Sequence, residues 1–218
     1  MNKLVFLFDI DNTLLDNDSV TVDLREHLER RVGHERQERY WSIFEELRRE
    51  VGYADYLGAL QRYRANYPRD LHVLTVSHFL LDYPFSERLF PNAIDVVEGV
   101  KAYARPVILS DGDVVFQPHK IRQAGLYDAF DGAVLIYVHK ELELEDVAQR
   151  YPAEHYILVD DKLRILSAVK QVWGKHVTTV FVRQGHYAFD QTAISGLPPA
   201  DYTIERIADI SQLDWSWH

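Results

Sequence analysis

Residues 4–13 read LVFLFDIDNT, an apolar run that ends in two aspartates. Its first five residues are aliphatic or aromatic, which is typical of a strand buried on both faces of a parallel sheet. Asp9 and Asp11 follow directly, and the Asn-Thr pair after them permits a turn. The stretch therefore predicts a strand that carries carboxylates at its carboxyl end, which is where open α/β sheets bind their ligands.

Four further apolar runs repeat this pattern along the chain, and amphipathic helical stripes lie between them. Strands that alternate with helices predict a doubly wound parallel α/β sheet that is covered on both faces. The expected strands cover residues 4–8, 107–109, 133–138, 156–159 and 177–182. The expected helical stripes cover residues 93–100, 144–151 and 165–173.

The segment that follows the first strand breaks this alternation, because it contains helical stripes and no convincing strand. Apolar residues within residues 40–51 recur at three- and four-residue spacing. Residues 21–70 hold ten arginines and ten acidic residues, so the rest of the chain carries the whole net charge of -10. We expect a helical cap of residues 17–87, inserted into a core of residues 1–16 and 88–218.

Composition narrows the classes of function. A chain of 218 residues that is 47% hydrophobic can form one sizeable core with a small appended unit. Its net charge of -10 opposes binding to nucleic acid or to an anionic membrane. The absence of cysteine excludes disulfides and thiolate metal sites. We expect a cytoplasmic protein that acts on a small molecule, either as a monomer or as a homodimer.

Polar residues follow four of the expected strands, at the edge where ligands bind. If the aspartates converge there, two charges about 4 Å apart repel by roughly 4 kcal/mol at an effective dielectric near 20, and a cation is needed. Oxygen ligands without cysteine or histidine favour Mg²⁺, which commonly shares its shell with a substrate phosphate. These residues are Asp9, Asp11, Ser110, Asp111, Gly112, Lys140, Asp160 and Asp161.

These residue types suit phosphoryl transfer. The Asp9 carboxylate can attack phosphorus and form an aspartyl-phosphate. Asp11 can protonate the leaving alcohol and deprotonate the attacking water. Ser110 and the backbone N–H groups near Gly112 can hold phosphoryl oxygens, and Lys140 supplies a positive charge.

Taken together, DIDNT at 9–13, ILSDG at 108–112, the lysine of VHKE at 138–141 and ILVDD at 157–161 resemble the four-motif signature of haloacid dehalogenase superfamily phosphatases. The resemblance extends over nearly the whole chain. It implies a helical cap and a Mg²⁺ cofactor, with Asp9 as nucleophile, Asp11 as acid and base, and Lys140 as the phosphoryl-stabilising cation. It also implies a substrate site of Thr13, Ser110, Asp111 and Gly112 and a metal site of Asp9, Asp11, Asp160 and Asp161.

The sequence departs from the family pattern at two positions. Asp111 stands where the family often has asparagine, and Asp160 where it often has glycine, while Asp113 adds a further carboxylate. Asp11 favours a phosphate ester over the carbon–halogen bond of the dehalogenase branch, which lacks this residue. The function expected is therefore hydrolysis of a small phosphorylated metabolite. A phosphotransferase such as a sugar-phosphate mutase and a non-catalytic metal-binding interaction module remain open.

Other residues invite a role but have simpler explanations. Lys120 competes with Lys140 for the role of the site cation, although Lys140 directly follows a strand. The arginine pairs at 30–31 and 48–49 could contact a substrate, but on helices rich in glutamate we expect most of them to form solvent-exposed ion pairs. The three histidines at positions 119, 139 and 186 favour surface or structural roles. Gly52 and Tyr53 are candidates for a cap loop over the site, and Trp215 and Trp217 for tail packing or a dimer contact.

Overall fold

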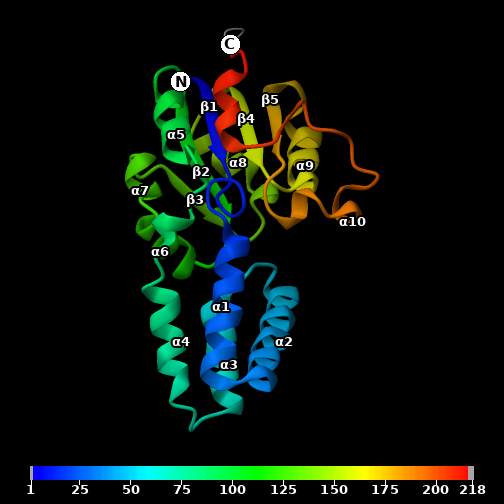
Figure 1. Cartoon of the computed structure of the whole chain (residues 1–218). Helices are drawn as coiled ribbons and strands as arrows, with labels where there is room; N and C mark the ends of the chain where they lie inside the picture. Colours follow the sequence, from blue (N-terminus) through cyan, green and yellow to red (C-terminus); the bar gives the residue numbers. More distant parts are fainter. Residues whose placement is uncertain (1, 216–218) are drawn as a thin grey trace.

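A six-stranded parallel sheet forms the centre of the molecule, in the order β3-β2-β1-β4-β5-β6. The computed structural model describes residues 2–215 (Figure 1). The strands are β1 (Asn2–Phe8), β2 (Arg105–Asp111), β3 (Val134–Tyr137), β4 (Ala153–Asp160), β5 (Val177–Val182) and β6 (Tyr202–Ile204). The predicted doubly wound α/β fold is confirmed.

Successive residues of β1 face opposite sides of the sheet, as the pleat of a strand requires. Phe6 and Phe8 belong to one hydrophobic core, whereas Val5 and Leu7 belong to a second. All four are fully buried, which explains why this strand has no polar alternation in its sequence. The first core includes α5 (Ala93–Lys101), α6 (Phe116–Gln123) and α7 (Leu126–Ala129), and the second includes α8 (Leu144–Arg150) and α9 (Leu163–Trp173).

Four consecutive helices follow β1 and lie together below the sheet in Figure 1. They are α1 (Asn17–Val32), α2 (His34–Val51), α3 (Tyr56–Asn66) and α4 (His72–Leu81). In α2 the buried residues Tyr40, Ile43, Phe44 and Leu47 follow the predicted helical spacing. Within residues 2–215, no helix combines the length and apolar character that a membrane span requires. The division of the chain into a cap and a core remains a prediction.

The two segments that connect these helices to the sheet run beside each other. Leu15 and Leu89 form an antiparallel bridge. The N–H of Asp16 donates to the carbonyl of Arg88 at 2.8 Å, and the N–H of Phe90 donates to the carbonyl of Leu14 at 2.9 Å. The chain therefore leaves the sheet and returns to it at one place.

Several elements are absent from the sequence-based prediction. These are β6, α6, α7 and α10 (Gln191–Ile194). Strands β2 and β4 are also longer than predicted, because backbone pairing extends to polar residues at their ends. Asp111 pairs with Tyr137, and His155 pairs with Leu4.

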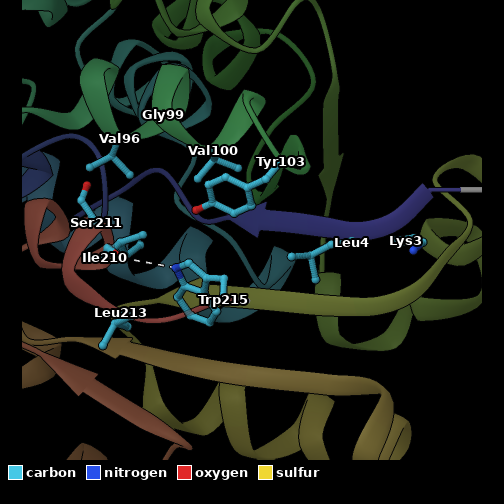
Figure 2. A pocket seen from close by; sticks show the side chains of 10 residues that line it. All are labelled: Lys3, Leu4, Val96, Gly99, Val100, Tyr103, Ile210, Ser211, Leu213 and Trp215. Atoms are coloured by element: carbon cyan, nitrogen blue, oxygen red, sulfur yellow. Dashed lines mark hydrogen bonds between the residues drawn. The ribbon is translucent and has the colours of Figure 1, made fainter. Parts of the chain in front are cut away.

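The C-terminal segment packs against the sheet. The ring of Trp215 lies 5.2 Å from that of Phe6 and 5.7 Å from that of Tyr202, and its Nε1 donates to the carbonyl of Ile210 at 3.3 Å. Figure 2 shows this ring in the wall of a cavity of about 530 Å³ between α5 and the C-terminal segment. Of the two explanations for the tail, packing on the body is confirmed for Trp215. Trp217 lies outside the described residues.

Candidate active site

The predicted site residues gather where β2, β1 and β4 end. These three strands are neighbours in the sheet, so their carboxyl ends meet at one edge. Asp9 directly follows β1, Asp111 ends β2 and Asp160 ends β4. Lys140 begins the short turn after β3 and is also fully buried.

Three buried carboxylates form a candidate metal site. Asp9, Asp160 and Asp161 each offer one oxygen, and these oxygens lie within 4.8 Å of one another. Neither side-chain oxygen of Asp161 has a hydrogen-bond partner among residues 2–215. Burial is the main cause that raises the pKa of Asp161, and the negative charge of Asp160 raises it further. A hard divalent cation such as Mg²⁺ fits this donor set, because it would neutralise the charge and use the unpaired oxygens.

Lys140 links two of these carboxylates. Its Nζ lies 2.5 Å from Oδ1 of Asp9 and 2.7 Å from Oδ2 of Asp160, and it donates to the carbonyl of Leu109 at 3.2 Å. Burial alone lowers the pKa of Lys140, but the charges of Asp160 and Asp9 outweigh burial, and the net pKa is raised. The Lys140 ammonium therefore stays charged.

The charge state of Asp9 follows from its neighbours. Burial raises the pKa of Asp9, but the charges of Lys140 and Lys162 lower it more, so its net pKa lies below the ordinary value. Thr13 Oγ1 donates to Oδ2 of Asp9 at 3.3 Å. Asp9 is thus a buried but ionised carboxylate, which is the form that a nucleophile requires.

Asp11 lies at the same edge, but its side chain is not part of the carboxylate group. Its Oδ1 accepts from Nζ of Lys120 at 2.5 Å, and its Oδ2 accepts from Nε2 of Gln117 at 3.3 Å. Asn12, with φ of 64°, turns the backbone just after it. Residues of α6 thus hold the carboxylate of Asp11. Metal ligation by Asp11 stays a prediction.

The second predicted motif forms a short network. Ser110 Oγ accepts from Nε2 of Gln117 at 2.9 Å. Oδ1 of Asp111 accepts from the backbone N–H of Lys140 at 2.8 Å, which fixes the lysine turn against β2. A Cβ at Gly112 would lie 2.9 Å from the Gln117 side chain, so glycine allows that side chain to approach.

Three residues outside the motifs have clear places in the structure. Asp113 Oδ1 accepts from the N–H groups of Val115 and Phe116, so this carboxylate stabilises the start of α6. His119 Nε2 hydrogen-bonds the carbonyl of Leu81, and His186 Nδ1 pairs with Oδ1 of Asp18, each at 2.6 Å. Structural roles for these two histidines are confirmed.

Sequence reasoning missed Lys162 and Gln117 as neighbours of the site. Burial lowers the pKa of Lys162, but the charges of Asp9, Asp161 and Asp160 raise it more, and the net pKa is raised. The position of Lys162 directly after Asp160 and Asp161 could have predicted that it lies near the site. Gln117 gave no such signal, because only the fold of α6 brings it to Ser110 and Asp11.

Two cavities adjoin the site from the side of the helical segment. The smaller, of about 210 Å³, is lined by residues that include Asp11, Asp111 and Lys162 together with Arg48, Gly52 and Tyr53. The larger, of about 460 Å³, shares Asp11, Arg48 and Lys162 with it. A Cβ at Gly52 would lie 2.7 Å from Cε1 of His139, so the loop after α2 touches the loop before Lys140. The two-residue loop suggested by Gly52 and Tyr53 therefore does line the site.

The prediction that most of the arginines at 30–31 and 48–49 form solvent-exposed ion pairs agrees with their exposure, but Arg48 has a second contact within the protein. Arg30 pairs with Glu26 on the surface, and Arg49 is exposed. Arg48 instead is half-buried, and its Nη2 donates to the hydroxyl of Tyr187. This contact depends on tertiary structure, because the last turn of α2 lies beside the loop after β5.

A family model described as haloacid dehalogenase-like hydrolase matches residues 4–172. A search of the curated proteins found no match. Among solved structures, a haloacid dehalogenase-like hydrolase from Burkholderia xenovorans LB400 is 59% identical, with a TM-score of 0.94, over 98% of this chain and 100% of that chain.

Two more distant structures share the fold. An L-2-haloacid dehalogenase from Xanthobacter autotrophicus, with chloropropionic acid covalently bound, is 19% identical over 98% of each chain, with a TM-score of 0.62. A hydrolase from Bacillus subtilis, bound to magnesium, is 16% identical over 97% of this chain and 98% of that chain, also with a TM-score of 0.62.

Proposed function

Because this chain belongs to the haloacid dehalogenase-like hydrolases, we propose that it is a magnesium-dependent phosphatase of small phosphate monoesters. The observation that carries the proposal is the arrangement around Asp9. Its carboxylate is buried, ionised and paired with Lys140 at 2.5 Å. It lies beside the carboxylate of Asp161, which has no hydrogen-bond partner in the described part of the chain. This arrangement supplies a nucleophile, a fixed positive charge and cation ligands within one pocket.

The reaction proceeds in two displacements. An oxygen of Asp9 attacks phosphorus, and the bond from phosphorus to the ester oxygen breaks. Asp11 acts in this step as a protonated carboxylic acid and gives its proton to the departing oxygen. A water then attacks the phosphorus of the aspartyl-phosphate and gives a proton to Asp11. The bond from phosphorus to the Asp9 oxygen breaks, which regenerates the Asp9 carboxylate and releases inorganic phosphate. Lys140 offsets negative charge near the phosphoryl group, while Thr13, Ser110 and the backbone at Asp111 orient its oxygens. The N–H of Gly112 instead donates to the carbonyl of Tyr137 at 3.0 Å.

The metal requirement follows from the three grouped carboxylates. Asp9, Asp160 and Asp161 would hold the Mg²⁺ ion, and Asp11 would contribute through its backbone carbonyl. When bound, the ion would supply positive charge to the phosphoryl oxygens. The distant hydrolase from Bacillus subtilis was solved with magnesium, which is compatible with this proposal.

Dehalogenation is the competing chemistry, since solved relatives of the same fold include an L-2-haloacid dehalogenase. A halide leaves as a stable anion and needs no proton, whereas an alkoxide does. Asp11, held by Lys120 and Gln117 at the edge of the pocket, is a residue that only the ester reaction needs. The carboxylate of Asp161, which has no hydrogen-bond partner among residues 2–215, would bind the cation in a metal-assisted reaction.

We further propose that α1 to α4 act as a cap that selects a small substrate. Arg48, Gly52 and Tyr53 of this segment line a cavity with Asp11 and Lys162. This cavity of about 210 Å³ and the adjoining one of about 460 Å³ do not exceed the range of about 300–1,000 Å³ common for drug-sized ligands. A small phosphorylated metabolite therefore suits them better than a phosphoprotein.

The decisive measurement is release of inorganic phosphate from a panel of small phosphate esters, with magnesium and with chelator. We expect magnesium-dependent release that falls by at least about 10³-fold in Asp9→Asn, because the amide cannot attack phosphorus. Asp128→Asn is the matched control, since Asp128 is exposed on the core surface.

Each result has a clear meaning. Retention of most activity in Asp9→Asn would exclude the aspartyl-phosphate mechanism. Consumption of ester without phosphate release would indicate transfer to a second substrate instead of hydrolysis. Halide release from haloacids without ester hydrolysis would place the chain with the dehalogenases.

A further inference from the structure

Arg48 and Tyr187 meet in the cleft between the helical segment and the sheet. Arg48 lies in the last turn of α2, and Tyr187 lies in a short turn after β5. Arg48 Nη2 donates to the Tyr187 hydroxyl, and its Cζ lies 5.8 Å from the centre of the Tyr187 ring. This pair, which we call the Arg48–Tyr187 pair, lines the same two cavities as Asp11 and Lys162.

Resting on the proposed phosphatase function, we propose that the Arg48–Tyr187 pair binds a second anionic group of the substrate. The substrate class is then a short phosphate monoester that carries a carboxylate or a further phosphate at its other end. One anion enters the pocket of Asp9, and the other reaches the guanidinium of Arg48.

The hydrogen-bonding capacity of the pair supports this inference. A guanidinium has five N–H donors, and Tyr187 accepts only one of them. The hydroxyl of Tyr187 accepts from Arg48, so its own hydrogen remains able to donate to a ligand. A planar guanidinium with free donors matches the geometry of a carboxylate or phosphate.

The charge of Arg48 is only weakly offset within the protein. Glu45 is its ion-pair partner, with a separation of 3.9 Å, and both side chains are partly exposed to solvent. By contrast, Arg164, the third cation lining the smaller cavity, is held by Glu141 at 2.9 Å. Arg48 therefore has more capacity to bind an anion than Arg164 has.

The negative charges that line the smaller cavity are already engaged. Asp11 is paired with Lys120 at 2.5 Å, and Asp111 accepts a backbone N–H. Lys162, whose Nζ lies 5.4 Å from the centre of the Tyr187 ring, is coupled by charge to Asp9, Asp160 and Asp161. The smaller cavity thus has one cation, Lys162, near Asp9, and another, Arg48, on the side of the helical segment.

The test uses phosphate esters that share one carbon frame and differ only at the far end. Hydroxyethyl phosphate, phosphoglycolate and ethylene glycol bisphosphate carry a hydroxyl, a carboxylate and a phosphate there, and the corresponding three-carbon series varies the reach. Turnover is measured as kcat/KM with magnesium. Affinity is measured independently by calorimetry in the presence of magnesium. This measurement uses the Asp9→Asn protein, because that variant cannot form the covalent intermediate.

We expect the anionic members to exceed the hydroxyl member by about 10- to 100-fold in both readouts, as a charge-assisted pair of hydrogen bonds would give. Arg48→Gln should bring the ratio of anionic to hydroxyl member close to one, both in kcat/KM and in affinity. Tyr187→Phe should lower this ratio by a smaller factor. Arg49→Gln is the matched control, because Arg49 is the exposed neighbour on the same helix, and it should keep the ratio. The preferred member of each series identifies the anion as carboxylate or phosphate.

The outcomes separate this inference from the function on which it rests. Hydrolysis of the hydroxyl member with no preference for an anion would overturn the inference and leave the phosphatase in place. An affinity preference that depends on Arg48, without turnover of any ester, would support the inference and overturn the phosphatase. If Arg48→Gln lowered kcat/KM and affinity equally for all members, with unchanged unfolding, Arg48 would only hold α2 against the loop after β5. That result would overturn the inference.

Discussion

Asp161 buries a carboxylate that has no hydrogen-bond partner in residues 2–215. Such a group destabilises the fold unless a cation binds it. In chelator, Asp161→Asn should therefore unfold with a free energy about 1–2 kcal/mol higher than the parent protein. With magnesium the order should reverse, because a ligand at a hundredfold excess over its Kd adds about 2.7 kcal/mol to the parent alone.

Urea unfolding of both proteins with magnesium and with chelator measures these differences. Asp128→Asn again serves as the exposed control. If the parent protein and Asp161→Asn gained equally from magnesium, Asp161 would not be a metal ligand.

Asp70 gives the helical segment a pH-dependent contribution to stability. Its carboxylate accepts from Arg36 Nη1, from the Tyr63 hydroxyl and from the backbone N–H of His72, each at 3.0 Å. Burial raises the pKa of Asp70, but these partners lower it more, and the net pKa lies below its ordinary value. A lowered folded pKa gives stability that is present above the unfolded value of about 3.9 and is lost as pH falls through the folded pKa.

Asp70→Asn should therefore lose about 1–2 kcal/mol near pH 7, and the difference from the parent protein should shrink below about pH 4. Urea unfolding across this pH range is the measurement. A difference that is constant with pH would mean that the Asp70 charge contributes nothing.

At the scale of elements, the loop after α2 is held against the loop before Lys140. Gly52 has φ of 88° and ψ of -3°, and a Cβ there would lie 2.7 Å from the His139 ring. Gly125 has nearly the same backbone, with φ of 78° and ψ of 0°, but no atom within 4 Å of its Cβ position. Both substitutions to alanine should cost about 1 kcal/mol of stability from the left-handed backbone alone.

Gly52→Ala should additionally lower kcat/KM, because the added methyl group pushes the cap loop away from His139 and the lysine turn. Gly125→Ala should leave kcat/KM near that of the parent protein. Steady-state kinetics with the best ester of the panel compares the two. Equal kinetics in the two variants would show that this contact has no part in turnover.

The elements that could be predicted from sequence are those with a strong local signal. The five main strands contain short runs of buried apolar residues, such as the run from Leu4 to Phe8 in β1. Strand β6 has only three residues, Tyr202–Ile204, and forms through pairing with β5, so its sequence alone gave no signal. Helix α6 begins with Phe116 and continues with Gln117 and a proline, a pattern that does not separate it from a loop.

At the scale of the whole molecule, sequence order predicted that Asp9, Asp160 and Asp161 would meet, because parallel strands bring their carboxyl ends together. It did not predict that α6 would hold the Asp11 side chain outside this group. It could not predict contacts between the helical segment and the sheet. Arg48 and Tyr187 are 139 residues apart, and only the packing of α2 beside the loop after β5 joins them. The acidic pocket was therefore predictable, whereas the residues that face it from the helices were not.

The antiparallel bridge between Leu15 and Leu89 has a consequence for the evolution of such enzymes. Because the intervening segment departs and returns at adjacent backbone positions, its length and content can change without displacing β1 or β2. The carboxyl edge of the sheet and the surface that faces it can then change separately. Exchange of the whole segment would then change the surface that faces the site, while Asp9, the proposed nucleophile, stays in place.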